Sequence, residues 1–218
     1  MSRNALDIET VPNVALICSL PEPEVKIGNL KDPEKIAEKI KEAKEDQISK
    51  MALFPYTGRI CSYAVYGDSV QKYHTIDEIS DVAEMELISE IMGILSLNNN
   101  QCDCVITWNG IQFDIPFIFI RAMLLKMELK CPAMSYFTKR YSHFPHTDMM
   151  KELVYWSNDH MRLNYASKLI LGKSKIDTDV TKFVEMIKTG QSDQIGIYNL
   201  MDAQLTYEIF LATEKYLF

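Results

Sequence analysis

Four acidic residues and one tyrosine stand in contexts that suit chemistry on a phosphate ester. Asp7 and Glu9 lie in the run Asn-Ala-Leu-Asp-Ile-Glu-Thr, whose apolar residues predict a strand. Alternate residues of a strand share one face, so these two carboxylates should converge on one point.

A third carboxylate, Asp114, is expected where a strand predicted at 105–108 gives way to a helix. An Asn-Gly pair marks the turn, and Pro116 suits the first turn of the helix. Further along, helical periodicity and a spacing of four place Tyr198 and Asp202 on one helix face. A phenol and a carboxylate can therefore reach one site together.

Carboxylates from separate elements are the ligands that a hard divalent cation such as magnesium prefers. Two such ions, about 3.5–4 Å apart, can activate an attacking water and stabilise the leaving oxygen of an in-line phosphoryl displacement. The four acids would hold the ions, and Tyr198 would orient or deprotonate the water.

The motifs resemble those of the DEDD-type 3′-5′ exonucleases in their tyrosine-containing subgroup. The most similar members are the stand-alone exonucleases related to the proofreading domain of family B DNA polymerases. The resemblance runs through Asp-Ile-Glu-Thr at 7–10, Asn-Gly-x-x-Phe-Asp-x-Pro at 109–116 and Tyr-x-x-x-Asp at 198–202, in the family's order. It implies an α/β, ribonuclease H-like fold with a central mixed sheet flanked by helices.

The same resemblance implies a role for each motif residue. The metal ligands would be Asp7, Glu9, Asp114 and Asp202, the water-positioning residue Tyr198, and the substrate contacts Thr10, Asn109 and Phe113. None of the four histidines stands four or five residues before a candidate final aspartate, so the tyrosine mechanism is expected.

Each residue also has a structural interpretation. A single acid at a strand end or helix start is more often a cap or a solvated group than a ligand, so the hypothesis depends on the conjunction of motifs. Trp108 is interpreted as a core residue, whereas Phe113 suits the core and base stacking equally. Basic residues at 139–140 and 168–182 are interpreted mostly as solvated faces.

The remaining pattern predicts a mixed α/β layout. Strands are expected at 3–9, 60–66, 70–74 and 104–108, and helices at 79–95, 115–127, 147–155, 163–171, 180–188 and 195–216. The 218 residues, 47% of them hydrophobic, suffice for one core, and we expect a single exonuclease domain over 1–218. A charged helical insertion is expected at about 21–51, with a solvated face as its simplest explanation and a substrate clamp or partner site as the alternatives.

Composition restricts the class of protein further. Five cysteines without paired zinc spacing indicate a reducing compartment, and Cys102 and Cys104 are expected to be buried thiols. The amino terminus leads directly into the first strand and no apolar run is long enough to span a bilayer, so we expect no signal peptide, no membrane contact and a cytoplasmic location. A net charge of −7 disfavours nucleic acid by itself, but several acids would belong to the metal site.

These observations and the resemblance together predict a metal-dependent 3′-5′ exonuclease. It would use two Mg²⁺ or Mn²⁺ ions and hydrolyse DNA from 3′ ends that are single-stranded or frayed. An RNA exonuclease is the close alternative, because a carboxylate site does not distinguish the two sugars. Two further alternatives stay open. One is a non-catalytic nucleic-acid-binding module, and the other is a proofreading subunit that acts with a separate polymerase or with replication and repair proteins.

Overall fold

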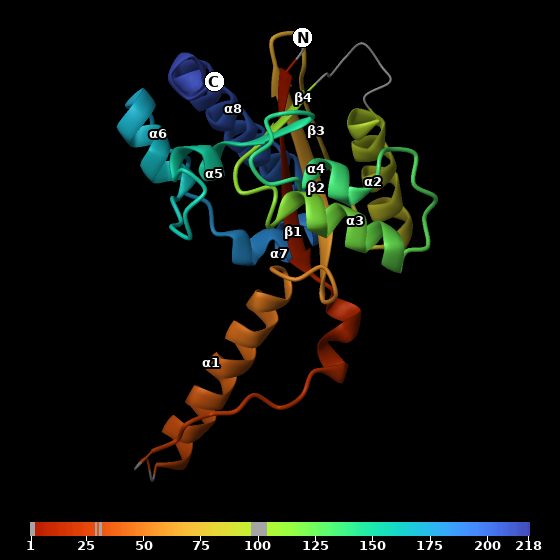
Figure 1. Ribbon diagram of the computed structural model, residues 1–218. Coiled ribbons are helices and arrows are strands. Elements are labelled where there is room, and N and C mark those ends of the chain that lie inside the picture. Colours follow the sequence, from red (N-terminus) through yellow and green to blue (C-terminus); the bar gives the residue numbers. More distant parts are fainter. Residues whose placement is uncertain (1–2, 29, 31, 97–103) are drawn as a thin grey trace.

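A five-stranded mixed sheet forms the centre of the computed structural model, which describes residues 3–28, 30, 32–96 and 104–218 (Figure 1). The strand order is β3-β2-β1-β4-β5. β1 pairs antiparallel with β2 and parallel with β4, β2 pairs antiparallel with β3, and β4 pairs parallel with β5. The strands are β1 (Arg3–Pro12), β2 (Gly58–Gly67), β3 (Gln71–Thr75), β4 (Cys104–Thr107) and β5 (His146–Asp148).

Helices cover both faces of the sheet (Figure 1). One face carries α2 (Asp81–Leu95), α3 (Asp114–Leu124) and α4 (Met134–Phe137). The other carries α5 (Met149–Leu153), α6 (Leu163–Leu171) and the long α8 (Ser192–Leu217). The remaining elements are the 3-10 turns η1 (Val14–Ser19) and η2 (Val180–Lys182) and the helices α1 (Pro33–Met51) and α7 (Phe183–Lys188).

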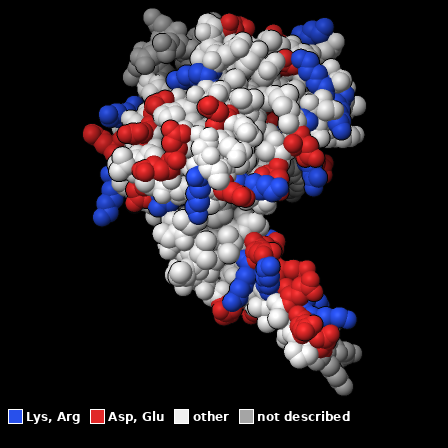
Figure 2. All heavy atoms as spheres, turned by 180° about the vertical axis from the view of Figure 1, so that it is seen from behind, with Lys and Arg blue, Asp and Glu red and all other residues white. Residues whose placement is uncertain are grey.

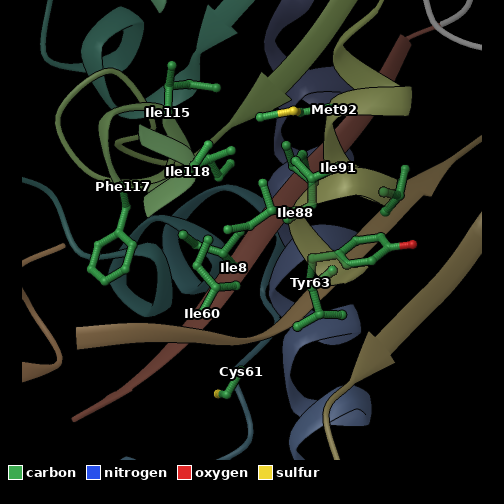
Figure 3. Packing of buried hydrophobic residues seen from close by; sticks show 14 of the residues in the cluster. Ile8, Ile60, Cys61, Tyr63, Ile88, Ile91, Met92, Ile115, Phe117 and Ile118 are labelled. Atoms are coloured by element: carbon green, nitrogen blue, oxygen red, sulfur yellow. The ribbon is translucent and has the colours of Figure 1, made fainter. Parts of the chain in front are cut away.

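The alternation of β1 separates its side chains between two hydrophobic clusters. Leu6 and Ile8 pack in the larger cluster with α2 and α3, whereas Ala5 packs with α8 in the smaller one. Figure 3 shows Ile8 in the larger cluster, together with residues of β2, α2 and α3. Because alternate residues share a face, Asp7 and Glu9 must lie on the side of the sheet that α8 covers.

Most elements predicted from the sequence are confirmed, but the helix expected at 147–155 is wrong at its start. Its first two residues belong to β5, and α5 begins only afterwards. β5 is fixed by parallel pairing with β4 and by the buried His146, whose ring bonds Thr107 Oγ1 at 2.7 Å and Phe137 O at 2.6 Å. Polar side chains buried in a three-residue strand leave no apolar alternation to detect.

The charged segment after β1 extends away from the body of the molecule (Figure 1). It contains η1 and α1, and residues 29 and 31 of it lie outside the described part. Asp32 caps α1 by accepting a hydrogen bond from Glu34 N at 3.0 Å. The visible surface of this arm carries both signs of charge (Figure 2), and ion pairs one turn apart join Lys50 to Asp46 at 2.6 Å and Lys41 to Glu45 at 3.9 Å.

The predictions of buried cysteines and of no membrane-spanning segment can be compared with the structure only over the described residues. Cys104 is buried as expected, whereas Cys102 lies outside the described residues. Among the helices that the structure describes, none combines the length and the apolar character needed to cross a bilayer.

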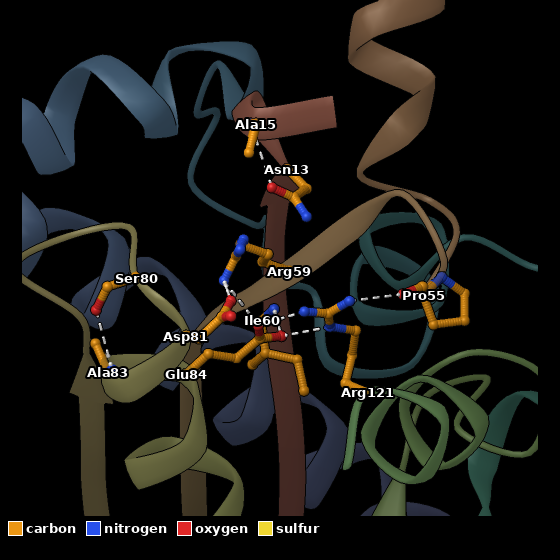
Figure 4. A network of polar contacts seen from close by, with 10 residues as sticks. All are labelled: Asn13, Ala15, Pro55, Arg59, Ile60, Ser80, Asp81, Ala83, Glu84 and Arg121. Atoms are coloured by element: carbon orange, nitrogen blue, oxygen red, sulfur yellow. Dashed lines mark hydrogen bonds and ion pairs between the residues drawn. The ribbon is translucent and has the colours of Figure 1, made fainter. Parts of the chain in front are cut away.

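A buried ion network joins α2, α3 and β2 (Figure 4). Glu84 is completely buried and accepts hydrogen bonds from Arg121 Nε and Nη2, both at 2.7 Å. It also accepts from Ile60 N at 3.0 Å and lies 3.4 Å from Arg59 Nη1. One carboxylate thus links α2 and α3 to the second strand.

The contact of α8 with the sheet depends on Gly196. A Cβ at this position would overlap the Tyr73 ring and approach Thr75 Oγ1 to 2.9 Å. We expect Gly196→Ala to lower the free energy of unfolding by about 1–3 kcal/mol, the usual cost of overpacking, in urea denaturation. Gly93→Ala is the control, because nothing lies within 4 Å of its added Cβ. In that helix interior alanine should stabilise by roughly 0.5–1 kcal/mol, and equal effects at both glycines would contradict the packing argument.

Candidate functional site

Three carboxylates from β1 and α8 meet at one point. Asp7, Glu9 and Asp202 each offer one oxygen, and these atoms lie within 4.8 Å of one another. Asp7 and Glu9 keep part of their surface exposed, whereas Asp202 is 4% exposed. The pairing of β1 with β2 shifts register just after Glu9, so a local irregularity in the strand borders the cluster.

Asp114 adds the fourth carboxylate from the opposite face of the sheet. It is the first residue of α3 and is buried, and its Oδ1 accepts a hydrogen bond from Ile8 N at 3.2 Å. Ile8 stands between Asp7 and Glu9, so this bond fixes Asp114 against the strand segment that bears both acids. The sequence prediction that one site collects all four acids therefore agrees with the geometry.

The loop from β4 to α3 is held by a second buried aspartate, Asp148. Its two carboxylate oxygens accept hydrogen bonds from Asn109 N and Ile111 N, both at 3.0 Å. Asn109 adopts a left-handed φ of 65°, and an added Cβ on Gly110 would overlap the Thr107 side chain. The Asn-Gly pair thus permits a tight turn that directs Asp114 toward β1.

Tyr198 lies one helical turn before Asp202 on α8 and is 7% exposed. Lys175, in the segment between α6 and η2, binds the Asp202 carboxylate through its ammonium group. The same ammonium lies 4.3 Å from the centre of the Tyr198 ring. The backbone N of Lys175 donates to Asn164 Oδ1 at 3.0 Å, which ties this segment to the start of α6.

Burial raises the pKa values of the four carboxyl groups, and repulsion within the cluster adds to the rise for Asp7 and Glu9. The pKa of Asp7 is raised well above its usual value by burial and then by the charges of Asp114, Asp202 and Glu9. Burial, with Asp202 next, raises the pKa of Glu9 to about 8. Burial also raises the pKa of Asp114 to about 7 and that of Asp202 to about 6, the latter against the opposing effect of Lys175. Positive charge in the cluster would relieve this repulsion.

The residues present fit a divalent cation. Asp202 Oδ1 is buried and has no hydrogen-bond partner among the described residues, although its other oxygen binds Lys175. A buried carboxylate oxygen without a partner carries a large desolvation cost, which a bound cation would offset. The three acids that meet in the described part of the chain offer carboxylate oxygens, which are ligands of Mg²⁺ and Mn²⁺ rather than of softer metals.

Of the three residues expected to contact substrate, Thr10 and Phe113 are sequence neighbours of Glu9 and Asp114, and Asn109 begins the turn that leads to Asp114. Thr10 follows Glu9 and donates its hydroxyl to Ala52 O at 2.7 Å. Asn109 has a buried Oδ1 without a hydrogen-bond partner in the described part of the chain. Phe113 precedes Asp114 and is half-buried, with its ring centre 5.5 Å from that of Phe117. Phe113 therefore contacts the core, and its stacking on a base stays a prediction.

Sequence reasoning missed two residues at the site. The lysines at 168–182 are interpreted mostly as solvated faces, and Lys175 is an exception, because its ammonium binds Asp202. No helical or strand period places this lysine, because it lies in an irregular segment fixed by one hydrogen bond to Asn164. Asp148 stands in the motif His-x-Asp at 146–148, whose buried strand carried too little pattern for its role to be seen.

Comparisons with known proteins agree with this geometry. Residues 54–217 match the family model described as a predicted 3′-5′ exonuclease related to the exonuclease domain of PolB. The DNA polymerases of Autographa californica and Bombyx mori nuclear polyhedrosis viruses are each 30% identical over 148 residues, which cover 59% of this chain and 15% of the viral protein. The chain thus spans only a small part of these curated relatives.

A solved structure shows the same fold. The family B DNA polymerase of the archaeon Pyrobaculum calidifontis superposes with a TM-score of 0.61 at 14% identity, over 99% of this chain and 24% of that one. The five-stranded mixed sheet and its flanking helices are accordingly the ribonuclease H-like fold predicted from the sequence. The chain belongs to the family of predicted 3′-5′ exonucleases related to the exonuclease domain of family B DNA polymerases.

Proposed function

We propose that this chain is a metal-dependent 3′-5′ exonuclease that removes mononucleotides from single-stranded or frayed DNA 3′ ends. The observation that carries the proposal is the convergence of Asp7, Glu9 and Asp202 within 4.8 Å, with Asp114 fixed beside them. The viral and archaeal relatives are DNA polymerases, which favours DNA as the substrate.

Asp7, Glu9, Asp114 and Asp202 would hold two divalent ions, Mg²⁺ or Mn²⁺. When bound, the ions supply positive charge that stabilises the phosphate as its negative charge develops. Tyr198 stands at the edge of the cluster and positions the attacking water by hydrogen bonding. This set of four acids and a tyrosine is that of the tyrosine subgroup of DEDD-type exonucleases.

Lys175 contributes a positive charge beside the cluster. In the structure its ammonium neutralises Asp202 and lies over Tyr198. We propose that it turns to the substrate phosphate when cations occupy the carboxylates, since a preorganised charge next to a reacting phosphate lowers the barrier. The net charge of −7 makes such local positive groups valuable for binding DNA.

The expected result for Lys175→Ala is a fall in kcat on single-stranded DNA of roughly 10²–10³-fold, the usual loss for one preorganised donor. Mn²⁺ binding, measured by calorimetry, should not weaken, because Asp202 keeps its charge and loses a competing cation. Lys173→Ala is the matched control, since Lys173 is exposed and pairs with Glu208 at 2.5 Å away from the cluster. Weaker Mn²⁺ binding or a kcat loss in both variants would contradict the assignment.

The substrate class is tested by comparing three labelled substrates under identical metal conditions. These are single-stranded DNA, duplex DNA with a mismatched 3′ end, and RNA of the same sequence. We expect the highest kcat/KM on the single strand, a lower value on the mismatched duplex, and the lowest on RNA. A preference for RNA would favour an RNA exonuclease instead. Tight DNA binding in Ca²⁺ without turnover in any metal would favour a non-catalytic nucleic-acid-binding module.

The chain spans 24% of the archaeal polymerase and 15% of the viral ones. We propose that it acts with a separate polymerase or with replication and repair proteins, because its relatives join such a domain to polymerase machinery. A pull-down with the polymerase of the same source would test this partnership. Binding that survives Asp114→Ala would show that the contact does not depend on the active site.

A further inference from the structure

An aromatic hollow lies between the end of α5 and the start of α6. Its volume is about 670 Å³ and its lining includes Leu153, Tyr155, His160, Arg162 and Tyr165. Sites for small ligands are usually 300–1,000 Å³ in size, so the hollow can accept a nucleotide-sized group. The functional assignment of the acids and of Tyr198 does not use any of these residues.

Two tyrosines that line this hollow are exposed to solvent. Tyr155 is 92% exposed and Tyr165 is 60% exposed, and both line the hollow. An exposed ring contributes little to folding, because its apolar surface stays in water. Rings held in water beside a cavity suit a flat apolar group that stacks on them.

The turn that presents Tyr155 is well fixed although its backbone is strained. Tyr155 and Trp156 have φ values of 53° and 57°, a left-handed conformation that bulky residues rarely adopt. Trp156 Nε1 donates to Glu152 Oε1 at 3.1 Å, and Trp156 N donates to Lys151 O at 2.8 Å. The Trp156 ring also packs on Tyr141 at 5.0 Å. The structure thus maintains a costly turn that points an aromatic ring outward.

The charges around the hollow suit phosphate groups. Arg162 and His160 line it, and both side chains are exposed. Asp159 also lines the hollow, but its carboxylate accepts a hydrogen bond from Ser157 Oγ at 3.0 Å. Aromatic rings with interleaved cations are the usual platform for single-stranded nucleic acid.

Two hydrogen bonds tie the segments around this hollow to segments that carry site residues. Met161, in its lining, accepts a bond from Trp108 Nε1 at 3.1 Å, and Trp108 directly precedes the loop that leads to Asp114. On the other side Asn164, next to Tyr165, holds the backbone of Lys175. The segment that lines the hollow is therefore hydrogen-bonded to the residue before the Asp114 loop, and the residue beside Tyr165 holds the segment that carries Lys175.

We propose that Tyr155 and Tyr165 stack on bases of a single DNA strand upstream of the 3′-terminal nucleotide, with Arg162 facing the phosphates. This inference rests on the proposed function, since it places the terminal nucleotide at the acidic cluster. It predicts that affinity rises with strand length and that the two rings supply most of this rise.

The test is fluorescence anisotropy in EDTA with labelled dithymidylate and with an oligothymidylate of roughly eight nucleotides, within the usual site sizes for such platforms. The unchanged protein should bind the longer strand more tightly than the shorter one. The double variant Y155A/Y165A should lose about tenfold or more per ring on the longer strand and little on the dinucleotide. Tyr155→Phe should bind as the unchanged protein does, because stacking does not need the hydroxyl.

Tyr216→Ala is the matched control, since Tyr216 is 76% exposed near the end of α8 and does not line the hollow. The inference is overturned if the unchanged protein shows no gain with length, if Y155A/Y165A keeps the gain, or if Y155A/Y165A loses affinity equally for both strands. It is also overturned if Tyr216→Ala loses the gain as well. Hydrolysis of the p-nitrophenyl ester of thymidine 5′-monophosphate by the unchanged protein reports on the proposed function separately, because that substrate contains one nucleotide.

Discussion

Asp202→Asn is expected to abolish measurable exonuclease activity while leaving the fold intact. Asp202 is the one acid of the cluster that α8 supplies, and asparagine has the same shape without the charge. Loss of a group that merely orients a metal ligand costs roughly 10–100-fold, so loss of a ligand itself should exceed about 10³-fold. Single-turnover hydrolysis of 5′-labelled single-stranded DNA measures the effect.

Two further readouts separate chemistry from structure in this variant. Mn²⁺ binding, measured by calorimetry, should weaken, whereas the circular dichroism spectrum should not change. Asp193→Asn is the matched control, because Asp193 is exposed in the first turn of the same helix. Activity within tenfold of the unchanged protein in Asp202→Asn would show that the cluster is not the catalytic centre.

Glu84→Gln should produce the largest loss of stability. Glu84 is completely buried between Arg121 and Arg59, and glutamine keeps its size but leaves the buried guanidinium of Arg121 without a counter-charge (Figure 4). Breaking a buried ion pair by removing one partner typically costs about 3–5 kcal/mol. Urea denaturation should therefore show a lower midpoint with an unchanged dependence on urea concentration.

The control for this variant is Glu86→Gln, on the same helix but exposed. Surface substitutions of this kind usually change stability by at most about 0.5 kcal/mol. Equal stability of Glu84→Gln and Glu86→Gln would show that the buried network does not stabilise the fold. A stability loss confined to Glu84→Gln would confirm that this carboxylate joins α2 and α3 to β2.

The acids proposed to be catalytic could be found in the sequence because regular elements place them. The spacing of two in β1 brings Asp7 and Glu9 to one face, and the spacing of four in α8 does the same for Tyr198 and Asp202. Such periodicity is a property of the backbone, so it can be read without knowing the tertiary structure. The Asn-Gly pair likewise marks the turn before Asp114, where Asn109 has a left-handed φ.

The residues that sequence reasoning missed depend on tertiary contacts. Lys175 reaches Asp202 only because an irregular segment is tied to Asn164 at the start of α6. Asp148 supports the Asp114 loop from a strand of three residues, which is too short for alternation to appear. Glu84 has the same local pattern as exposed acids of α2, and only the packing of Arg121 distinguishes it.

Metal-dependent 3′-5′ exonuclease activity at the acidic cluster can be tested in one experiment. A 5′-labelled single-stranded DNA oligonucleotide is incubated with Mg²⁺ or Mn²⁺, and its products are separated by length. An EDTA lane and Asp114→Ala serve as controls, since Asp114 is fixed against β1 beside the cluster. We expect a ladder that shortens from the 3′ end, needs metal and is absent in Asp114→Ala. Absence of a ladder with either metal from folded protein, or an equal ladder from Asp114→Ala, would contradict this expectation.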